Sequence, residues 1–78
     1  FNMGLVLAKQ GKHEEAIFYY DMAIARYPQL PDIWLNKGVS LYELKKYNDA
    51  LKCFERVLEL SPENSDGKTW KEKTLKLI

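Results

Sequence analysis

Catalysis or metal binding would have to start from His13 and Cys53, the only histidine and the only cysteine in the chain. A zinc site needs several such ligands close together, and a thiol nucleophile needs a base within hydrogen-bond reach. We expect His13 to lie in a turn and Cys53 to face outward beside Lys52 and Arg56, so the two cannot assemble either site. No glycine-rich phosphate loop, dinucleotide fingerprint or paired-carboxylate signature is present. The sequence therefore predicts a non-enzymatic protein with no cofactor and no metal.

The lysines near the C-terminus are the next candidates for chemistry, because Trp70 stands among them. They are Lys68, Lys71, Lys73 and Lys76. Basic groups interleaved with an aromatic can bind nucleic acid, but Asp66 and Glu72 are interspersed here and the formal net charge is only +1. We interpret these lysines as the solvated surface of an end helix. Since no apolar run approaches the roughly 20 residues of a membrane span, the sequence predicts neither a nucleic-acid nor a membrane partner.

A fixed separation of 34 residues relates nine pairs of residues along the chain. Within the pairs small residues match small ones, aromatics match aromatics and proline matches proline. The pairs are Asn2 and Asn36, Gly4 and Gly38, Leu7 and Leu41, Ala16 and Ala50, Ile17 and Leu51, Tyr20 and Phe54, Ala23 and Val57, Ile24 and Leu58, and Pro28 and Pro62. A period of this length is typical of helix-turn-helix repeats, which bury their apolar faces only by stacking on one another. The sequence predicts an all-α repeat solenoid.

These residues resemble the tetratricopeptide repeat (TPR), which carries Gly in its first helix, then Ala, an aromatic and Ala in its second, and a closing Pro. The better copy reads Trp34, Gly38, Leu41, Ala50, Phe54, Val57 and Pro62, and the earlier copy reads Gly4, Leu7, Ala16, Tyr20, Ala23 and Pro28. The resemblance covers nearly the whole chain and implies one TPR-like module that binds proteins. It divides the module into a repeat lacking its first turn (1–30), a complete repeat (31–64), and a capping helix or truncated third repeat (65–78).

Turn and cap signals divide the chain into five expected helices, near residues 1–9, 14–27, 31–44, 48–60 and 70–78. Gly11 supplies a left-handed turn, and Pro28 and Pro62 end the second and fourth helices. We expect residues 63–67 to form a polar turn, with Asn64 or Ser65 as a cap for the last helix. If two extra residues are allowed in this turn, Trp70 aligns with Trp34.

The start of the chain and its single cysteine give two further expectations. The run from Phe1 to Leu5 has no capping residue and resembles the interior of a helix, so we expect a longer parent protein with repeat sequence upstream. One cysteine excludes an internal disulfide and is consistent with a reducing compartment. We therefore expect a cytoplasmic location.

The resemblance implies a binding groove, because the first helices of successive TPR hairpins line a concave surface that holds a peptide or helix of a partner. In the first repeat the inward positions are Phe1, Asn2, Leu5, Ala8 and Lys9. In the second they are Leu35, Asn36, Val39, Tyr42 and Glu43, with Asp32 at the rim. An Asn amide can donate to and accept from a peptide backbone, so Asn36 and Asn2 are expected to give a sequence-independent grip. The alternative is that Phe1 and Leu5 are core residues that pack on an upstream repeat.

One TPR variant holds the acidic C-terminus of heat-shock chaperones in a clamp of Lys, Asn and Arg side chains. Of its positions only Asn36 matches, while Phe1 and Leu5 stand where the first Lys and Asn belong. A carboxylate clamp needs convergent positive charge. We therefore expect no such clamp, and instead an apolar groove for a partner with aliphatic or aromatic anchors.

The outer face of the second helix carries Phe18, Tyr19 and Met22, where the fourth helix has Lys52, Cys53 and Arg56. An apolar patch on one outer helix and not the other is a candidate association surface. Self-association as a homo-oligomer, through this patch or through the edge at Phe1, is therefore the alternative to peptide binding. A non-catalytic part of a larger enzyme or regulator is the third class that the sequence leaves open.

Overall fold

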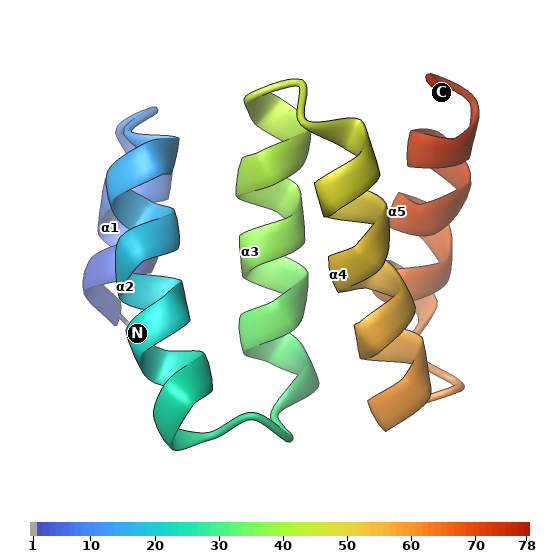
Figure 1. The fold of residues 1–78 in the computed structure, drawn as a ribbon, viewed down its shortest axis with the longest axis horizontal. Coiled ribbons are helices and arrows are strands. Elements are labelled where there is room, and N and C mark those ends of the chain that lie inside the picture. The colour runs from blue at the N-terminus through green and yellow to red at the C-terminus, as the bar shows by residue number, and fades with distance from the viewer. Residues whose placement is uncertain (1) are drawn as a thin grey trace.

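The computed structural model describes residues 2–78 and arranges them as five helices without a strand, confirming the all-α repeat solenoid (Figure 1). The helices are α1 (Asn2–Lys9), α2 (His13–Arg26), α3 (Pro31–Glu43), α4 (Tyr47–Leu60) and α5 (Ser65–Leu75). The first four agree with the expected ranges to within a residue at each end. Phe1 lies outside the described residues.

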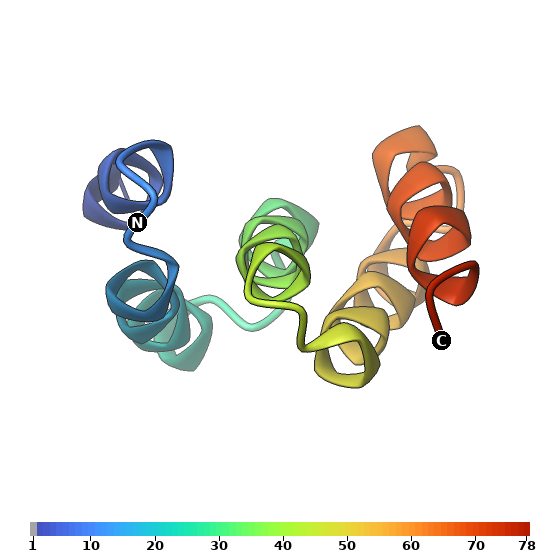
Figure 2. The same cartoon turned by 90° about the horizontal axis from the view of Figure 1, so that it is seen from above.

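The helices stack in chain order as antiparallel hairpins, α1 with α2 and α3 with α4, and α5 packs against α4 (Figure 1). Seen from above, α2 and α4 form one layer and α1, α3 and α5 form the other (Figure 2). Because α3 is set back between α1 and α5, the layer of first helices is concave. The array measures 27 × 25 × 16 Å along its principal axes.

The two hairpin turns have the same backbone geometry although their residues differ. Gly11 has φ = 80° and Lys45, 34 residues later, has φ = 64°. In each turn the next amide closes the helix end, with Lys12 N bonded to Leu7 O at 2.8 Å and Lys46 N bonded to Leu41 O at 2.9 Å. These bonds satisfy carbonyls that a helix C-terminus leaves without partners. The left-handed turn expected at Gly11 is confirmed, and Lys45 adopts it without being glycine.

Small residues are required where the helices of a hairpin cross. Ala16 and Ala50 are fully buried, and a Cβ atom built on Gly38 would lie 2.5 Å from Cε1 of Phe54. The same atom on Gly4 would lie 2.6 Å from Cε1 of Tyr20. Real Cβ contacts are not this short, so the repeated glycines make room for the repeated aromatic rings.

The aromatic rings also join one hairpin to the next. Tyr20 packs in a core cluster with Ile33 of the following hairpin. Phe54 stacks on Trp70 of α5, with ring centroids 5.9 Å apart and an interplanar angle of 23°. The core is therefore continuous along the stack, as stacked repeats require.

The last helix begins at Ser65, earlier than expected, and ends at Leu75 rather than Ile78. Asn64 caps it, with its Oδ1 accepting a hydrogen bond from the Gly67 amide at 2.8 Å. With this cap, residues 65–67 of the predicted turn form the start of the helix instead. Of the two expected caps, Asn64 is the one that the structure uses.

Burial in α5 follows the direct 34-residue count. Thr74 is fully buried, as is Ser40 at the same place in α3. The place of Leu41, which is 7% exposed, does not distinguish the two alignments, because the direct count puts Leu75 there and the alternative with two extra residues puts Leu77 there, and these are 50% and 49% exposed. Two buried residues of α5, Gly67 and Thr74, thus stand 34 residues after the buried Ile33 and Ser40 of α3.

Candidate functional site

The concave layer contains a hollow of about 370 Å3 between α1 and α3, with one end of α2 below it. Six of the predicted groove residues line it: Leu5, Ala8, Lys9, Asn36, Val39 and Glu43. Leu5 and Val39 provide apolar surface, Asn36 an amide, and Lys9 and Glu43 one charge of each sign. The structure therefore brings these six side chains together from positions about 30 residues apart in the chain.

The polar floor of this hollow contains residues that the sequence did not assign to it. His13, at the start of α2, has its Nδ1 3.2 Å from Oγ of the buried Ser40. Tyr20 lies beside them, and burial raises the pKa of its hydroxyl while a hydrogen bond with Ser40 acts in the opposite direction. Ser40 follows Asn36 by four residues and so shares its helix face. That spacing could have predicted Ser40 as a residue of the hollow. The position of His13 could not be predicted in this way, because it depends on how α2 packs on α3.

The remaining predicted groove residues do not line this hollow. Asn2 and Asp32 are exposed. Leu35 and Tyr42 are half-buried and pack against the core cluster formed by Leu41, Ala50, Cys53 and Phe54. The Tyr42 ring packs edge-on against Tyr47 at 5.4 Å and against Trp70 at 5.1 Å. Tyr42 therefore helps to attach α5. Phe1, also expected here, lies outside the described residues.

On the opposite side of α3, a second hollow of about 400 Å3 is formed by α2, α3 and α4. Cys53 lines it and is only 4% exposed, so the expectation that it faces outward was wrong. The preceding hairpin covers this side of α4, which a pattern read within one helix does not show. Burial raises the pKa of the Cys53 thiol to about 11, with Lys37 acting against the rise and Asp21 and Asp49 adding to it.

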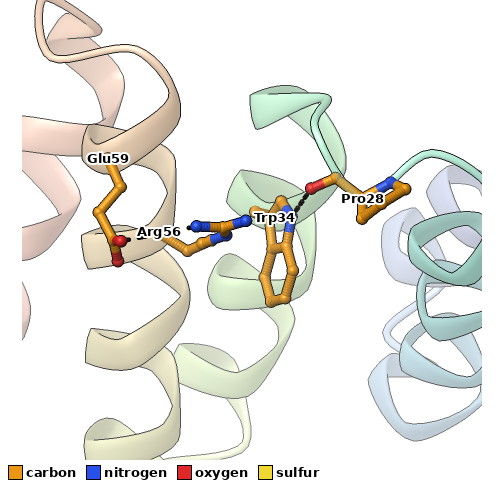
Figure 3. Close-up of polar contacts among 4 residues, drawn as sticks. All are labelled: Pro28, Trp34, Arg56 and Glu59. Carbon is orange, nitrogen blue, oxygen red and sulfur yellow. Dashed lines mark hydrogen bonds and ion pairs between the residues drawn. The ribbon is translucent and has the colours of Figure 1, made fainter.

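Trp34 closes this side and ties the loop between the hairpins to α3. Its Nε1 donates a hydrogen bond to the Pro28 carbonyl at 2.8 Å (Figure 3). Arg56 of α4 lies 5.9 Å from the centre of the Trp34 ring and pairs with Glu59 at 3.5 Å (Figure 3). Lys37 of α3 also bonds to Asp21 of α2 at 2.6 Å. Of these contacts, the Trp34–Pro28 hydrogen bond and the Lys37–Asp21 ion pair connect the second hairpin to the first, whereas those of Arg56 lie within the second hairpin.

The predicted association patch on α2 is exposed. Phe18 is 61%, Met22 53% and Tyr19 37% exposed, and the rings of Phe18 and Tyr19 meet edge-on at 5.4 Å. A third hollow, of about 360 Å3, lies beside the patch toward α1 and is lined by Met3, Tyr19, Met22, Ala23, Arg26 and Tyr27. Apolar side chains therefore lie together on the outer end of the array.

Neither metal-binding nor membrane-spanning features occur within residues 2–78. No three His, Cys, Asp or Glu side chains there are close enough to hold a metal ion together. None of the five described helices has the length and apolar character needed to cross a bilayer.

The family model of the tetratricopeptide repeat matches residues 1–30 and 31–64. The chain belongs to the tetratricopeptide repeat family. TPR units are protein-interaction modules and are generally not enzymes themselves. The resemblance seen in the sequence is thus confirmed, together with the expectation of protein partners in general.

Similar TPR sequences occur in proteins of very different kinds. The chain is 33% identical over 64 residues to a UDP-N-acetylglucosamine–peptide N-acetylglucosaminyltransferase of Giardia intestinalis, covering 82% of this chain and 4% of that protein. It is 29% identical over 89 residues to the photosystem I assembly protein Ycf3 of Acaryochloris marina, covering 95% of this chain and 54% of Ycf3. It is 30% identical over 71 residues to the human intraflagellar transport protein 88 homolog, covering 85% of this chain and 9% of that protein. In each case the chain spans only part of the relative's length.

Proposed function

We propose that this TPR chain is a non-enzymatic scaffold that binds a peptide or a helix of a partner protein in the groove between α1 and α3. The observation that carries the proposal is the hollow in which Leu5, Lys9, Asn36, Val39 and Glu43 converge. It combines apolar surface with an amide and two opposite charges, which suits a segment with an aliphatic anchor and flanking polar groups.

The charges of the groove argue against an acidic tail as the ligand. Lys9 is the only Lys or Arg side chain among the residues that line the hollow, and Glu43 stands with it. A clamp for carboxylates concentrates several positive groups on the ligand. An uncharged or mixed-charge segment therefore fits better than the C-terminus of a chaperone.

Two features of the wider molecule support the same assignment. Glu72 of α5 is exposed and takes the place at which Gly4 and Gly38 admit an aromatic ring, so α5 cannot receive a second helix in the same way. We propose that α5 caps the array at residues 65–78 and leaves the concave layer as the binding face.

The free thiol of Cys53 suits the cytoplasm or another reducing compartment.

The test uses short peptides selected from a random displayed library on the wild-type chain. The affinity of one selected peptide is then measured by fluorescence anisotropy for the wild type and for Asn36→Ala with Val39→Ala. We expect at least a tenfold loss, about 1.4 kcal/mol. The matched control is Asn48→Ala, which removes the same amide from the exposed start of α4.

Circular dichroism establishes that both variants keep their helices. If the folded double variant binds the peptide with unchanged affinity, the binding site does not lie on the concave layer. An equal loss in Asn48→Ala would show that the selected peptide binds the outer layer instead.

A further inference from the structure

The outer face of α2 carries a stripe of four exposed side chains, Glu15, Tyr19, Met22 and Arg26. Their spacing of four, three and four residues places them on one face of a helix with 3.6 residues per turn. The stripe thus has an acidic group at one end, a base at the other, and two large apolar side chains between them. This spacing is also that of the seam along which two helices pack in a coiled coil.

The stripe is complementary to a second copy of itself. When two such helices run antiparallel about a two-fold axis, Tyr19 of one copy faces Met22 of the other. The same operation places Glu15 of each copy opposite Arg26 of its partner, so that two ion pairs flank the apolar centre. From this charge and shape complementarity we infer that the chain forms a symmetric homodimer through antiparallel α2 helices.

Phe18 adds to the same contact. It lies one helical turn before Met22 at the side of the stripe and is 61% exposed. The two-fold axis brings the Phe18 residues of the two copies to one side of the seam, separated by roughly 8 Å along the helix axes at 1.5 Å per residue. Aromatic rings span such a separation, so the dimer covers the most exposed aromatic ring of α2.

The repeat pattern does not account for this stripe. The equivalent residues of α4 are Asp49, Cys53, Arg56 and Leu60, which lack the symmetric order, and Cys53 is covered by the preceding hairpin. This side of a second helix is therefore a face on which helices pack within the molecule. In Figures 1 and 2, α1 and α2 form one end of the array.

Met3 distinguishes α1 from α3 and α5, which both pack on a preceding helix of the array. At its place α3 has Lys37, paired with Asp21, and α5 has Lys71, within 4.0 Å of Glu55. Met3 is exposed and apolar, so it cannot form the ion pair that Lys37 and Lys71 form with the preceding helix. A second copy needs no such pair at Met3, because its Arg26 lies opposite Glu15.

The test is sedimentation equilibrium of the wild-type chain over a wide concentration range. We expect a reversible monomer–dimer equilibrium, weak because each copy contributes a single helix. Glu15→Arg alone and Arg26→Glu alone should each weaken the dimer at least tenfold, because each places like charges opposite one another twice. An equimolar mixture of these two variants should dimerise again, since every like pair then becomes an opposite pair.

Glu14→Arg is the matched control, because it makes the same charge change one residue away from the stripe. It should dimerise like the wild type, and mixing it with Arg26→Glu should not restore the affinity that the Glu15→Arg mixture restores. Circular dichroism checks that every variant stays helical. The inference is overturned if the wild-type chain remains monomeric at every concentration, because this face of α2 then does not bind a second copy. A mixture of Glu15→Arg and Arg26→Glu that fails to associate also overturns it. Neither result bears on the groove, which lies on the opposite layer.

Discussion

Replacing Gly38 by Ala tests whether close approach of an aromatic ring sets the geometry of the hairpin. The new Cβ would lie 2.5, 2.9 and 3.0 Å from Cε1, Cδ1 and Cζ of Phe54. All three atoms belong to one rigid ring that is fully buried and stacked on Trp70. The ring cannot swing aside as a flexible side chain would, so the hairpin has to open or the stack on α5 has to shift.

The expected magnitude is the difference of two opposing effects. Overpacking a well-filled core costs about 1–3 kcal/mol, and a contact this short to a buried ring belongs in the upper part of that range. Ala is about 1 kcal/mol better than Gly inside a helix. We therefore expect Gly38→Ala to lower the free energy of unfolding by about 1–2 kcal/mol. For a domain of this size that corresponds to roughly 5–15 °C in Tm.

Urea denaturation followed by circular dichroism, at one protein concentration for all variants, gives the free energies. Ala25→Gly at an exposed position of α2 measures the helix-propensity contribution in this chain. In a Phe54→Leu background the ring edge is gone, so Gly38→Ala should cost little or should stabilise. The reasoning is refuted if Gly38→Ala is as stable as the wild type, or if its cost is unchanged in the Phe54→Leu background.

Three further variants test the strained turn conformations and the buried thiol. Lys45→Gly should stabilise the chain by about 1 kcal/mol, because Lys45 holds φ = 64°, a left-handed conformation that only glycine adopts without strain. Gly11→Ala, at the equivalent turn, should destabilise the chain by a similar amount in urea denaturation. A Gly11→Ala variant that is more stable than the wild type would contradict the argument. The pKa of Cys53 is raised from 9.0 to about 11 in the folded chain, so its thiol should resist iodoacetamide at pH 8 until the chain unfolds. Because that pKa is raised, the associated stability is present below pH 9 and is lost as the pH rises toward 11. The free-energy difference between wild type and Cys53→Ala should therefore be constant below pH 9 and fall above it, and a flat difference across this range would refute the shift.

The groove positions were predicted from the resemblance to the TPR, which places them on the inward face of the first helices. Six of them, Leu5, Ala8, Lys9, Asn36, Val39 and Glu43, line one hollow in the structure. Their role in binding stays a prediction, to be tested by the peptide experiment. The packing of Tyr42 was not predictable in this way, because an inward position on α3 faces α5 as well as the groove.

The burial of Cys53 and the extent of α5 show a second limit of sequence reasoning. Within α4 the neighbours Lys52 and Arg56 indicated an outward face for Cys53, yet the preceding hairpin covers it. For α5 the pattern around Trp70 suggested a late start, while the cap at Asn64 and the close packing of Gly67 against Val57 begin the helix at Ser65. The cover over Cys53 and the packing of Gly67 on Val57 are contacts between different helices, whereas the Asn64 cap is local and was one of the two caps expected from the sequence.

By itself, the sequence determined the family, the helices of each repeat and the small residues at their crossings. It did so because these features depend on contacts within a hairpin, whose partners stand at constant spacings along the chain. The tertiary structure alone decided which side chains share a hollow, which thiol is buried and how α2 packs on α1 and α3. Those outcomes depend on how one hairpin lies on the next, through contacts such as Trp34 with Pro28 and Lys37 with Asp21. The angle between stacked hairpins is the sum of many such contacts, and no single residue spacing specifies it.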